Sequence, residues 1–184
     1  MQKNMIVLKP KRKDPGLKNS KHPKILFQVS AFDNMIIYLK SNLTIEQGGF
    51  LLGKSKPNDG IDISVFIPAF HTIATKSSLQ FTAKTWDEYD DQKKEKFPGL
   101  ELVGWAHTHP DLGAFLSNKD KTVNMFFKYI AVVWDPLRKE IGFFYLKSSP
   151  EPLIPVQITG KPRIQIDFKN YEIEKIDEAI GVKK

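Results

Sequence analysis

The sequence predicts an α/β domain built on a mixed central β-sheet with helices on its faces. Segments with the patterns of strands alternate with segments of helical periodicity, which is typical of helices packed on a sheet. Some expected strands are joined only by tight turns, so parallel and antiparallel neighbours are both required. The 184 residues are 41% hydrophobic and contain no cysteine. One domain with its own core, free of disulfides, accounts for this length.

The first expected elements lie between residues 25 and 53. Residues 25–29 read as a strand, and Ser30 then opens a helix in which Ser30 and Asp33 form a capping box. The apolar face of this helix recurs with helical spacing over Phe32, Met35, Ile36, Leu39 and Leu43. Residues 46–53 form an apolar strand, led in by Gly48 and Gly49.

The middle of the chain predicts a turn, two strands and a charged surface helix. The turn at 57–60 precedes strand 61–68, whose apolar residues alternate as on a strand with one buried face. Residues 84–97 predict the helix, with Thr85 and Glu88 as its capping box. Another strand covers 100–108.

The last third predicts a helix over 117–129, with Val123, Phe126, Phe127 and Ile130 on one face. The continuous apolar run 130–134 predicts a strand covered on both sides, and residues 135–147 complete a hairpin with it. Two short segments follow Ser148, at 164–168 and in a final helix near 171–180.

The net charge of +7 belongs entirely to the beginning of the chain. Residues 1–24 hold eight Lys or Arg and one acid, whereas the other 160 residues hold 20 of each sign. Residues 1–23 therefore read as a basic arm, in which residues 5–8 could add an edge strand. Such an arm can bind nucleic acid, but a solvated arm is the preferred interpretation.

Several functional classes are excluded by composition. Without cysteine there is no Cys-ligated zinc, iron–sulfur cluster or thiol nucleophile. No apolar run reaches the roughly 20 residues of a membrane span, and the basic N-terminus lacks the apolar stretch of a secretory signal. We expect a cytoplasmic protein.

The chemically informative residues are His107, His109 and Asp120. On a strand, two residues at this spacing point to the same face, and Pro110 ends the strand beside them. Asp120 falls in the first turn of the next helix, where a carboxylate is favoured. Two imidazoles and a carboxylate suit zinc, with a fourth position for water. Taken alone, the two histidines would more often be structural.

A metal-activated water needs a carboxylate to take its proton. Glu46 is the candidate, because Gly48 and Gly49 next to it permit close approach of a backbone or substrate. Glu101 is the rival, but six residues of strand place it roughly 20 Å from His107. Spacing alone does not show which acid faces the histidines.

These residues together resemble the JAMM metalloprotease motif of the MPN (JAB1/Mov34) superfamily. The motif positions are Glu46, His107-Thr108-His109-Pro110, Ser117 and Asp120. The likeness extends over about 30–147 and includes the flanking segments 46–53, 102–105 and 131–136. It implies three parts, namely the basic arm 1–23, a JAMM/MPN catalytic domain 24–147 and a C-terminal extension 148–184.

The resemblance implies a cytidine-deaminase-like α/β/α sandwich and a zinc isopeptidase. By matching positions, His107, His109 and Asp120 would bind one zinc ion, Glu46 would be the general base and Ser117 would stabilise the oxyanion. Ser117 and Asp120 also fit a helix capping box, and both roles can coexist. Trp105, Phe115 and Trp134 are interpreted as core or rim packing, and His22 and His71 as residues outside the site.

The expected activity is cleavage at the C-terminus of a ubiquitin-like protein, from a conjugate or from a precursor. The short, insertion-poor domain is similar to prokaryotic members, so E1- or E2-like conjugation enzymes are expected partners. Residues 71–98 lie where the family's first insertion would be and could hold the substrate tail. The alternatives are a JAMM hydrolase of a small peptide or sulfur-carrier adduct, and a non-catalytic MPN scaffold.

Overall fold

The computed structural model describes residues 3–11, 22–56, 60–148 and 151–178. Its main feature is a nine-stranded mixed sheet in the order β11-β1-β10-β2-β4-β3-β7-β8-β9. The nine strands in chain order are β1 Lys3–Pro10, β2 Ile25–Gln28, β3 Gly48–Lys56, β4 Gly60–Pro68, β7 Glu101–Thr108, β8 Ile130–Asp135, β9 Glu140–Tyr145, β10 Val156–Thr159 and β11 Tyr171–Glu178. Parallel pairs β10–β2, β2–β4 and β7–β8 occur beside antiparallel ones, so the expected mixed α/β architecture is confirmed.

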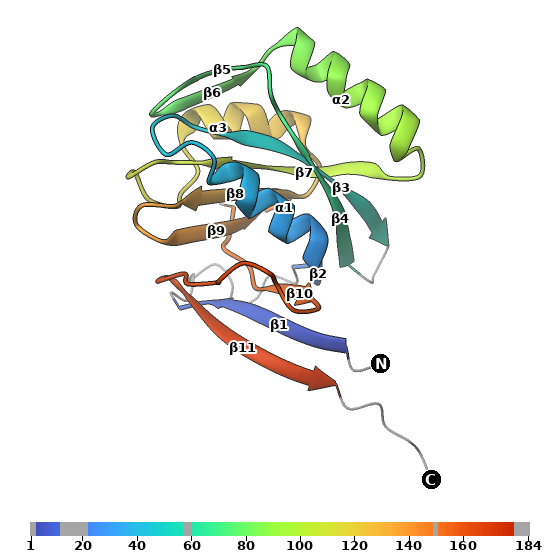
Figure 1. The fold of residues 1–184 in the computed structure, drawn as a ribbon, viewed down its shortest axis with the longest axis vertical. Coiled ribbons are helices and arrows are strands. Elements are labelled where there is room, and N and C mark those ends of the chain that lie inside the picture. Colours follow the sequence, from blue (N-terminus) through green and yellow to red (C-terminus); the bar gives the residue numbers. More distant parts are fainter. Residues whose placement is uncertain (1–2, 12–21, 57–59, 149–150, 179–184) are drawn as a thin grey trace.

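Helix α1 (Val29–Leu39) covers one face of the sheet, as Figure 1 shows. Its buried apolar residues Phe32, Met35 and Leu39 join a cluster with residues from β2, β4, β8 and β10. The predicted apolar stripe is therefore confirmed up to Leu39, whereas Leu43 lies beyond the helix and is exposed.

The opposite face of the sheet carries a second cluster, in which aromatic side chains are numerous. Helix α2 (Ala83–Lys96) packs here with the hairpin β5 (Thr72–Thr75) and β6 (Ser78–Phe81). Strand β8 shows how both faces are filled, since Val132 belongs to the α1 cluster and Val133 to the aromatic cluster. Every residue of β8 is buried, which confirms the interpretation of its apolar run.

The two ends of the described chain meet in one ladder at the far side of the sheet. Strand β1 pairs with β10 on one side and β11 on the other, so it is an inner strand, and the expectation of an edge strand is wrong. The final helix expected near 171–180 is also wrong over 171–178, which form β11. Residues 171–178 form a strand because β1 offers them eight paired positions.

Three further expectations about helix ends are corrected by the contacts in the structure. Helix α1 begins at Val29, with no side-chain cap, and Asp33 is instead buried and accepts hydrogen bonds from Arg163. Thr82, not Thr85, caps α2. The helix expected over 117–129 is only α3 (Asn118–Val123) followed by a 3₁₀ turn, which leaves Phe126 exposed.

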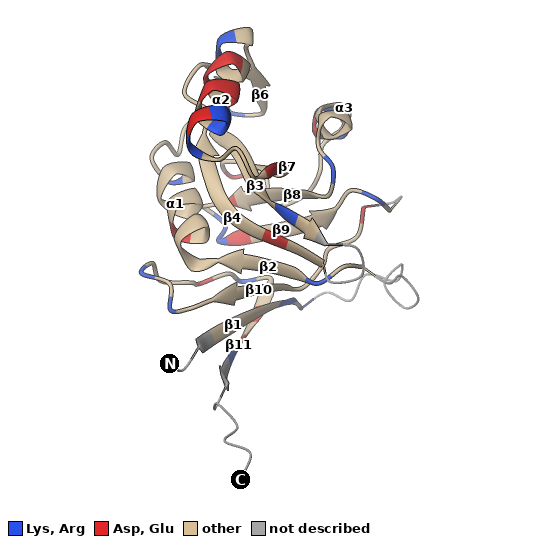
Figure 2. Ribbon diagram, turned by 90° about the vertical axis from the view of Figure 1, so that its right-hand side faces the viewer, with Lys and Arg blue, Asp and Glu red and all other residues tan. Residues whose placement is uncertain are grey.

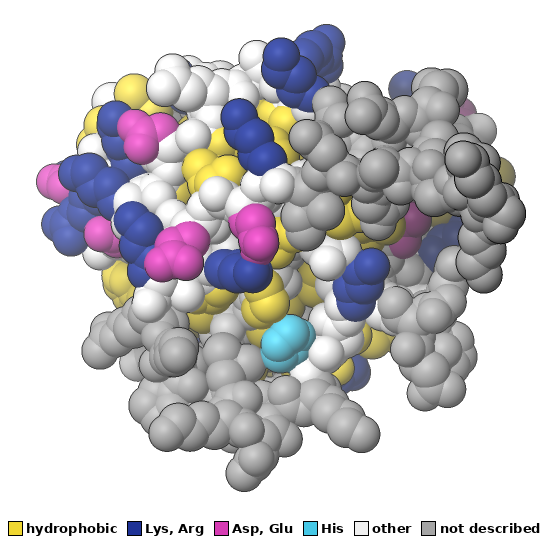
Figure 3. Space-filling model, turned by 90° about the horizontal axis from the view of Figure 1, so that it is seen from below, with side chains coloured by type: hydrophobic (Ala, Val, Ile, Leu, Met, Phe, Trp, Pro, Cys, Tyr) yellow, Lys and Arg dark blue, Asp and Glu magenta, His cyan; other side chains and the backbone are white. Residues whose placement is uncertain are grey.

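Acidic and basic residues both lie along α2, as Figure 2 shows. The lower face seen in Figure 3 carries basic and acidic side chains side by side. Part of the basic arm belongs to this sheet, where Lys9 forms an ion pair with Glu174. The rest of the arm, residues 12–21, lies outside the described residues, as does most of the turn predicted at 57–60. Among the described helices none is long and apolar enough to span a membrane.

Candidate metal centre

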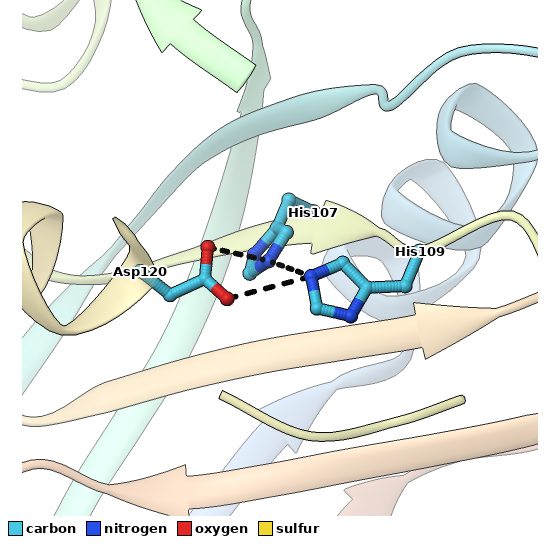
Figure 4. A group of neighbouring side chains, drawn as sticks. All are labelled: His107, His109 and Asp120. Atoms are coloured by element: carbon cyan, nitrogen blue, oxygen red, sulfur yellow. Dashed lines mark hydrogen bonds and ion pairs between the residues drawn. The ribbon is translucent and has the colours of Figure 1, made fainter. Parts of the chain in front are cut away.

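The candidate metal centre forms where the C-terminal end of β7 meets the start of α3. His107 lies near the end of β7, His109 follows it, and Asp120 lies in the first turn of α3, all with side chains pointing toward one another (Figure 4). One nitrogen or oxygen from each lies within 4.8 Å of the others, and all three residues are buried. The structure therefore brings together the three residues that the spacing predicted.

The donor atoms face one another in an arrangement that suits a cation. His107 Nε2 lies 3.1 Å from His109 Nε2 and 3.2 Å from Asp120 Oδ1, and His109 Nε2 lies 3.4 Å from Asp120 Oδ2. Tetrahedral zinc with bonds of about 2.0–2.1 Å separates its ligands by about 3.3 Å. The lone pairs of two imidazole nitrogens that face each other also repel, unless a proton or a metal lies between them. The residues fit a zinc ion by number, type and spacing.

The pKa shifts show how this site behaves when it holds protons instead of a metal. Burial lowers the pKa of His107. Burial acts on His109 in the same direction, but its hydrogen bond with Asp120 and the charges of Asp120 and Glu46 outweigh this and raise its pKa. The pKa of Asp120 falls despite its burial, because of His107, His109 and Ser117. The buried group thus favours a single positive charge opposite Asp120.

Each histidine has its own support from outside the cluster. His109 Nδ1 lies 3.2 Å from the Gly113 carbonyl oxygen. Because this oxygen can only accept a hydrogen bond, Nδ1 is the donor and Nε2 is free to face the centre. Gly113 has φ +94° and donates its amide to the Asp135 carboxylate at 2.7 Å. His107 instead stacks on Trp105, with ring centroids 4.1 Å apart and planes at 8°. Its Nδ1 is buried and has no hydrogen-bond partner among the residues that the structure describes.

Glu46 lies at the edge of the same cluster. Glu46 is 2% exposed, and its Oε1 lies 3.8 Å from His109 Nε2. Burial raises the pKa of Glu46 to about 8, against the opposing effect of His109. A carboxyl group with such a pKa can take up and release a proton near neutral pH.

The rival acid lies at the other end of β7. Glu101 accepts hydrogen bonds from Lys128 at 2.8 Å and from the Ser55 hydroxyl at 2.7 Å. These bonds lower the pKa of Glu101 to about 2. Glu101 is therefore engaged away from the histidines, as its distance along the strand predicted.

Ser117 begins α3 and forms the predicted capping box. Its hydroxyl accepts a hydrogen bond from the Asp120 amide at 3.2 Å, and its own amide donates to Asp120 Oδ2 at 2.7 Å. The box orients the carboxylate that faces the histidines. The hydroxyl's second expected role, at an oxyanion, stays a prediction.

The other singled-out residues occupy supporting positions. Trp105 and Trp134 are buried in the core, while Phe115 is exposed and its ring lies 5.0 Å from that of His109. His71 forms an ion pair with Glu88 of α2. The space beside Gly48 is taken by the chain itself, through Leu79 of β6 and the Ala106 carbonyl.

Two supporting residues were missed by sequence reasoning. Asp135 is fully buried and accepts backbone hydrogen bonds from Asp111, Gly113, Leu137 and Arg138, yet its Asp-Pro sequence indicated only a turn. Thr108 is also fully buried and accepts a hydrogen bond from the Gln47 amide. The sequence signal for Thr108 was its position, a hydroxyl residue between the two expected ligands His107 and His109.

Comparison with known proteins identifies the family to which the chain belongs. The sequence model of the "JAB1/Mov34/MPN/PAD-1 ubiquitin protease" family matches residues 21–131. COP9 signalosome complex subunit 5 of Caenorhabditis elegans is 31% identical over 185 residues, covering 92% of this chain and 46% of that protein. Its Drosophila melanogaster counterpart is 29% identical over 143 residues, covering 74% of this chain and 42% of the relative. The chain thus spans slightly under half the length of these curated relatives.

A solved structure supports the fold independently. The solution structure of a protein from Desulfitobacterium hafniense superimposes with a TM-score of 0.58. It covers 76% of this chain and 95% of its own, at 16% sequence identity. At this identity the likeness concerns the fold alone.

Proposed function

Since the chain belongs to the JAB1/Mov34/MPN/PAD-1 ubiquitin protease family, we propose that it is a zinc-dependent peptidase or isopeptidase. The observation that carries this proposal is the convergence of His107, His109 and Asp120 beside the buried Glu46. Every position of the motif is occupied by a residue able to do its chemistry.

Bound by His107, His109 and Asp120, zinc would supply Lewis-acid polarisation of a carbonyl and a lowered pKa for water. Glu46 would take a proton from the attacking water and deliver it to the leaving amine, for which its position next to His109 suits it. The Ser117 hydroxyl would donate a hydrogen bond to the oxyanion. The burial of Glu46 and of the three expected ligands excludes bulk water and strengthens their electrostatic effects.

The proposed substrate is the C-terminus of a ubiquitin-like protein, joined to a lysine amine or to a precursor extension. The family description, which names a ubiquitin protease, supports this class. We assign residues 71–98, which form β5, β6 and α2, to holding the substrate tail. Support comes from the Glu46 amide, which donates to the Thr75 carbonyl at 2.8 Å and so joins this hairpin to the proposed base. E1- or E2-like enzymes are proposed partners.

The first test is the metal content of the purified chain, measured by elemental mass spectrometry without added zinc. We expect about one zinc per chain in the wild type and in His22→Ala, whose histidine lies outside the centre, but little in His109→Ala. Hydrolysis is then assayed on ubiquitin bearing a C-terminal fluorophore and on a short peptide with the same last residues. Absence of zinc, even after reconstitution, would refute the proposal and leave the scaffold interpretation. Equal cleavage of both probes would favour a small-peptide hydrolase.

A further inference from the structure

The residue between the two histidines makes contacts that the metal centre does not require. Thr108 is fully buried, and since neighbouring residues of a strand point to opposite faces, its side chain leaves β7 on the side opposite to His107. Its Oγ1 accepts a hydrogen bond from the Gln47 amide at 2.8 Å. Its own amide donates to the Gln47 carbonyl at 2.9 Å. Both hydrogen bonds thus go to the residue next to Glu46.

Glu46 needs such an anchor because it lies outside the strand that follows it. Strand β3 begins at Gly48, which is paired with His107 in the β3–β7 ladder. The two Gln47–Thr108 hydrogen bonds extend this pairing by one residue toward Glu46. In one of the two, the Thr108 side-chain oxygen accepts the Gln47 amide, so this bond depends on a hydroxyl at position 108.

We propose that Thr108 is a positioning residue, whose hydroxyl fixes the segment carrying Glu46 to the strand carrying the histidines. It keeps the Glu46 carboxyl group 3.8 Å from His109 Nε2 while itself standing on the other side of the strand. This inference rests on the proposed function only where it concerns turnover. Its structural part, the attachment of Gln47 to Thr108, can be measured in the chain without substrate.

The substitution that tests it is Thr108→Val, which keeps the shape and removes the acceptor. Thr108→Ser restores a hydroxyl and serves as the rescue. Thr159→Val is the matched control, because Thr159 likewise loses a side-chain hydrogen bond, to Gln28 at 2.9 Å, but lies on β10 away from the centre. The three variants and the wild type are compared by amide hydrogen exchange at Gln47, zinc affinity by chelator competition, and kcat and KM.

In Thr108→Val we expect Gln47 to exchange faster by at least about 10-fold, since its amide loses its acceptor. We expect kcat to fall between about 10- and 100-fold, as for a misplaced catalytic group, with KM and zinc affinity within about twofold. Thr108→Ser and Thr159→Val should match the wild type in exchange at Gln47 and in kcat. A merely structural defect would lower zinc affinity and thermal stability together with kcat.

Three results would overturn the proposal. They are unchanged exchange at Gln47 in Thr108→Val, loss of zinc affinity in parallel with kcat, and failure of Thr108→Ser to restore protection. If Thr108→Val does not fold, the smaller pair Thr108→Ala and Thr108→Ser answers the same question. A wild type that neither binds zinc nor hydrolyses any probe refutes the proposed function, and exchange at Gln47 then decides the positioning role by itself.

Discussion

Strand β7 has a glutamate near each of its ends, and the two glutamates lie in opposite surroundings. At its start, Glu101 faces Lys128 and Ser55 near the surface, and these partners lower its pKa to about 2. Near its end lies Glu46, where burial raises the pKa to about 8. Sequence reasoning considered both as the general base. Solvation and hydrogen-bond partners, and not residue type, therefore decide which carboxyl group can exchange protons near neutral pH.

The largest expected effect separates the two glutamates by activity. Glu46→Gln should lower kcat by about 10²- to 10⁴-fold, because the amide cannot accept the proton, while zinc content stays at the wild-type level. Glu101→Gln, the matched change at the other end of the strand, should leave kcat within about twofold. Both are measured with the fluorogenic ubiquitin probe alongside elemental analysis. Full activity in Glu46→Gln would remove Glu46 from the role of base.

A smaller effect is expected from the carboxylate that supports the buried end. Asp135→Asn keeps the shape of the side chain but replaces one carboxylate oxygen with an NH₂ group, which cannot accept the hydrogen bond from the Gly113 amide. We therefore expect the free energy of unfolding to fall by about 1–3 kcal/mol. Because Gly113 in turn holds His109, zinc affinity should weaken by about 10-fold.

Ser55→Ala is the counterpart of Asp135→Asn at the exposed end, where one hydrogen bond to Glu101 is lost. It should cost less than about 1 kcal/mol and leave zinc affinity unchanged. Urea denaturation and chelator competition measure the two quantities. Equal zinc affinity in Asp135→Asn and the wild type would show that Gly113 does not depend on Asp135 to hold His109.

The parts predicted correctly from the sequence share short-range signals. The convergence of His107, His109 and Asp120 needs only a two-residue spacing on a strand and a helix start. The capping box of Ser117 and Asp120 follows from four adjacent residues. Likewise, the all-apolar run of β8 predicts a strand buried on both faces. Within such elements, local periodicity and local geometry fix what the side chains contact.

The parts predicted wrongly depend on partners far away in the chain. Asp33 looked like a capping residue, but it is held by Arg163, which lies 130 residues further on. Residues 171–178 have charges and apolar residues compatible with a helix, yet they pair with β1 at the other end of the sequence. The contact between Gln47 and Thr108 spans 61 residues. Such contacts have no local pattern from which to infer them.

The smallest expected effect is the pH dependence of the exposed end of β7. Because the pKa of Glu101 is lowered in the folded chain, its pair with Lys128 stabilises the fold above the unfolded pKa of about 4.3. That contribution is lost as the pH falls from about 4.3 toward 2. The Lys128 side chain is 56% exposed, so solvent screening keeps the contribution under about 1 kcal/mol.

Lys128→Met tests this contribution, because it removes the charge and keeps most of the stem. We expect the variant to be slightly less stable than the wild type at pH 7 and equal to it near pH 2, by urea denaturation at each pH. Salt at about 1 M should shrink the difference at pH 7, because both charges face solvent. A difference that persists unchanged at low pH would mean that the Lys128 stem contributes by packing. The contrast between the ends of β7 would then rest on Ser55 alone, since its hydroxyl and amide would be what holds the pKa of Glu101 down.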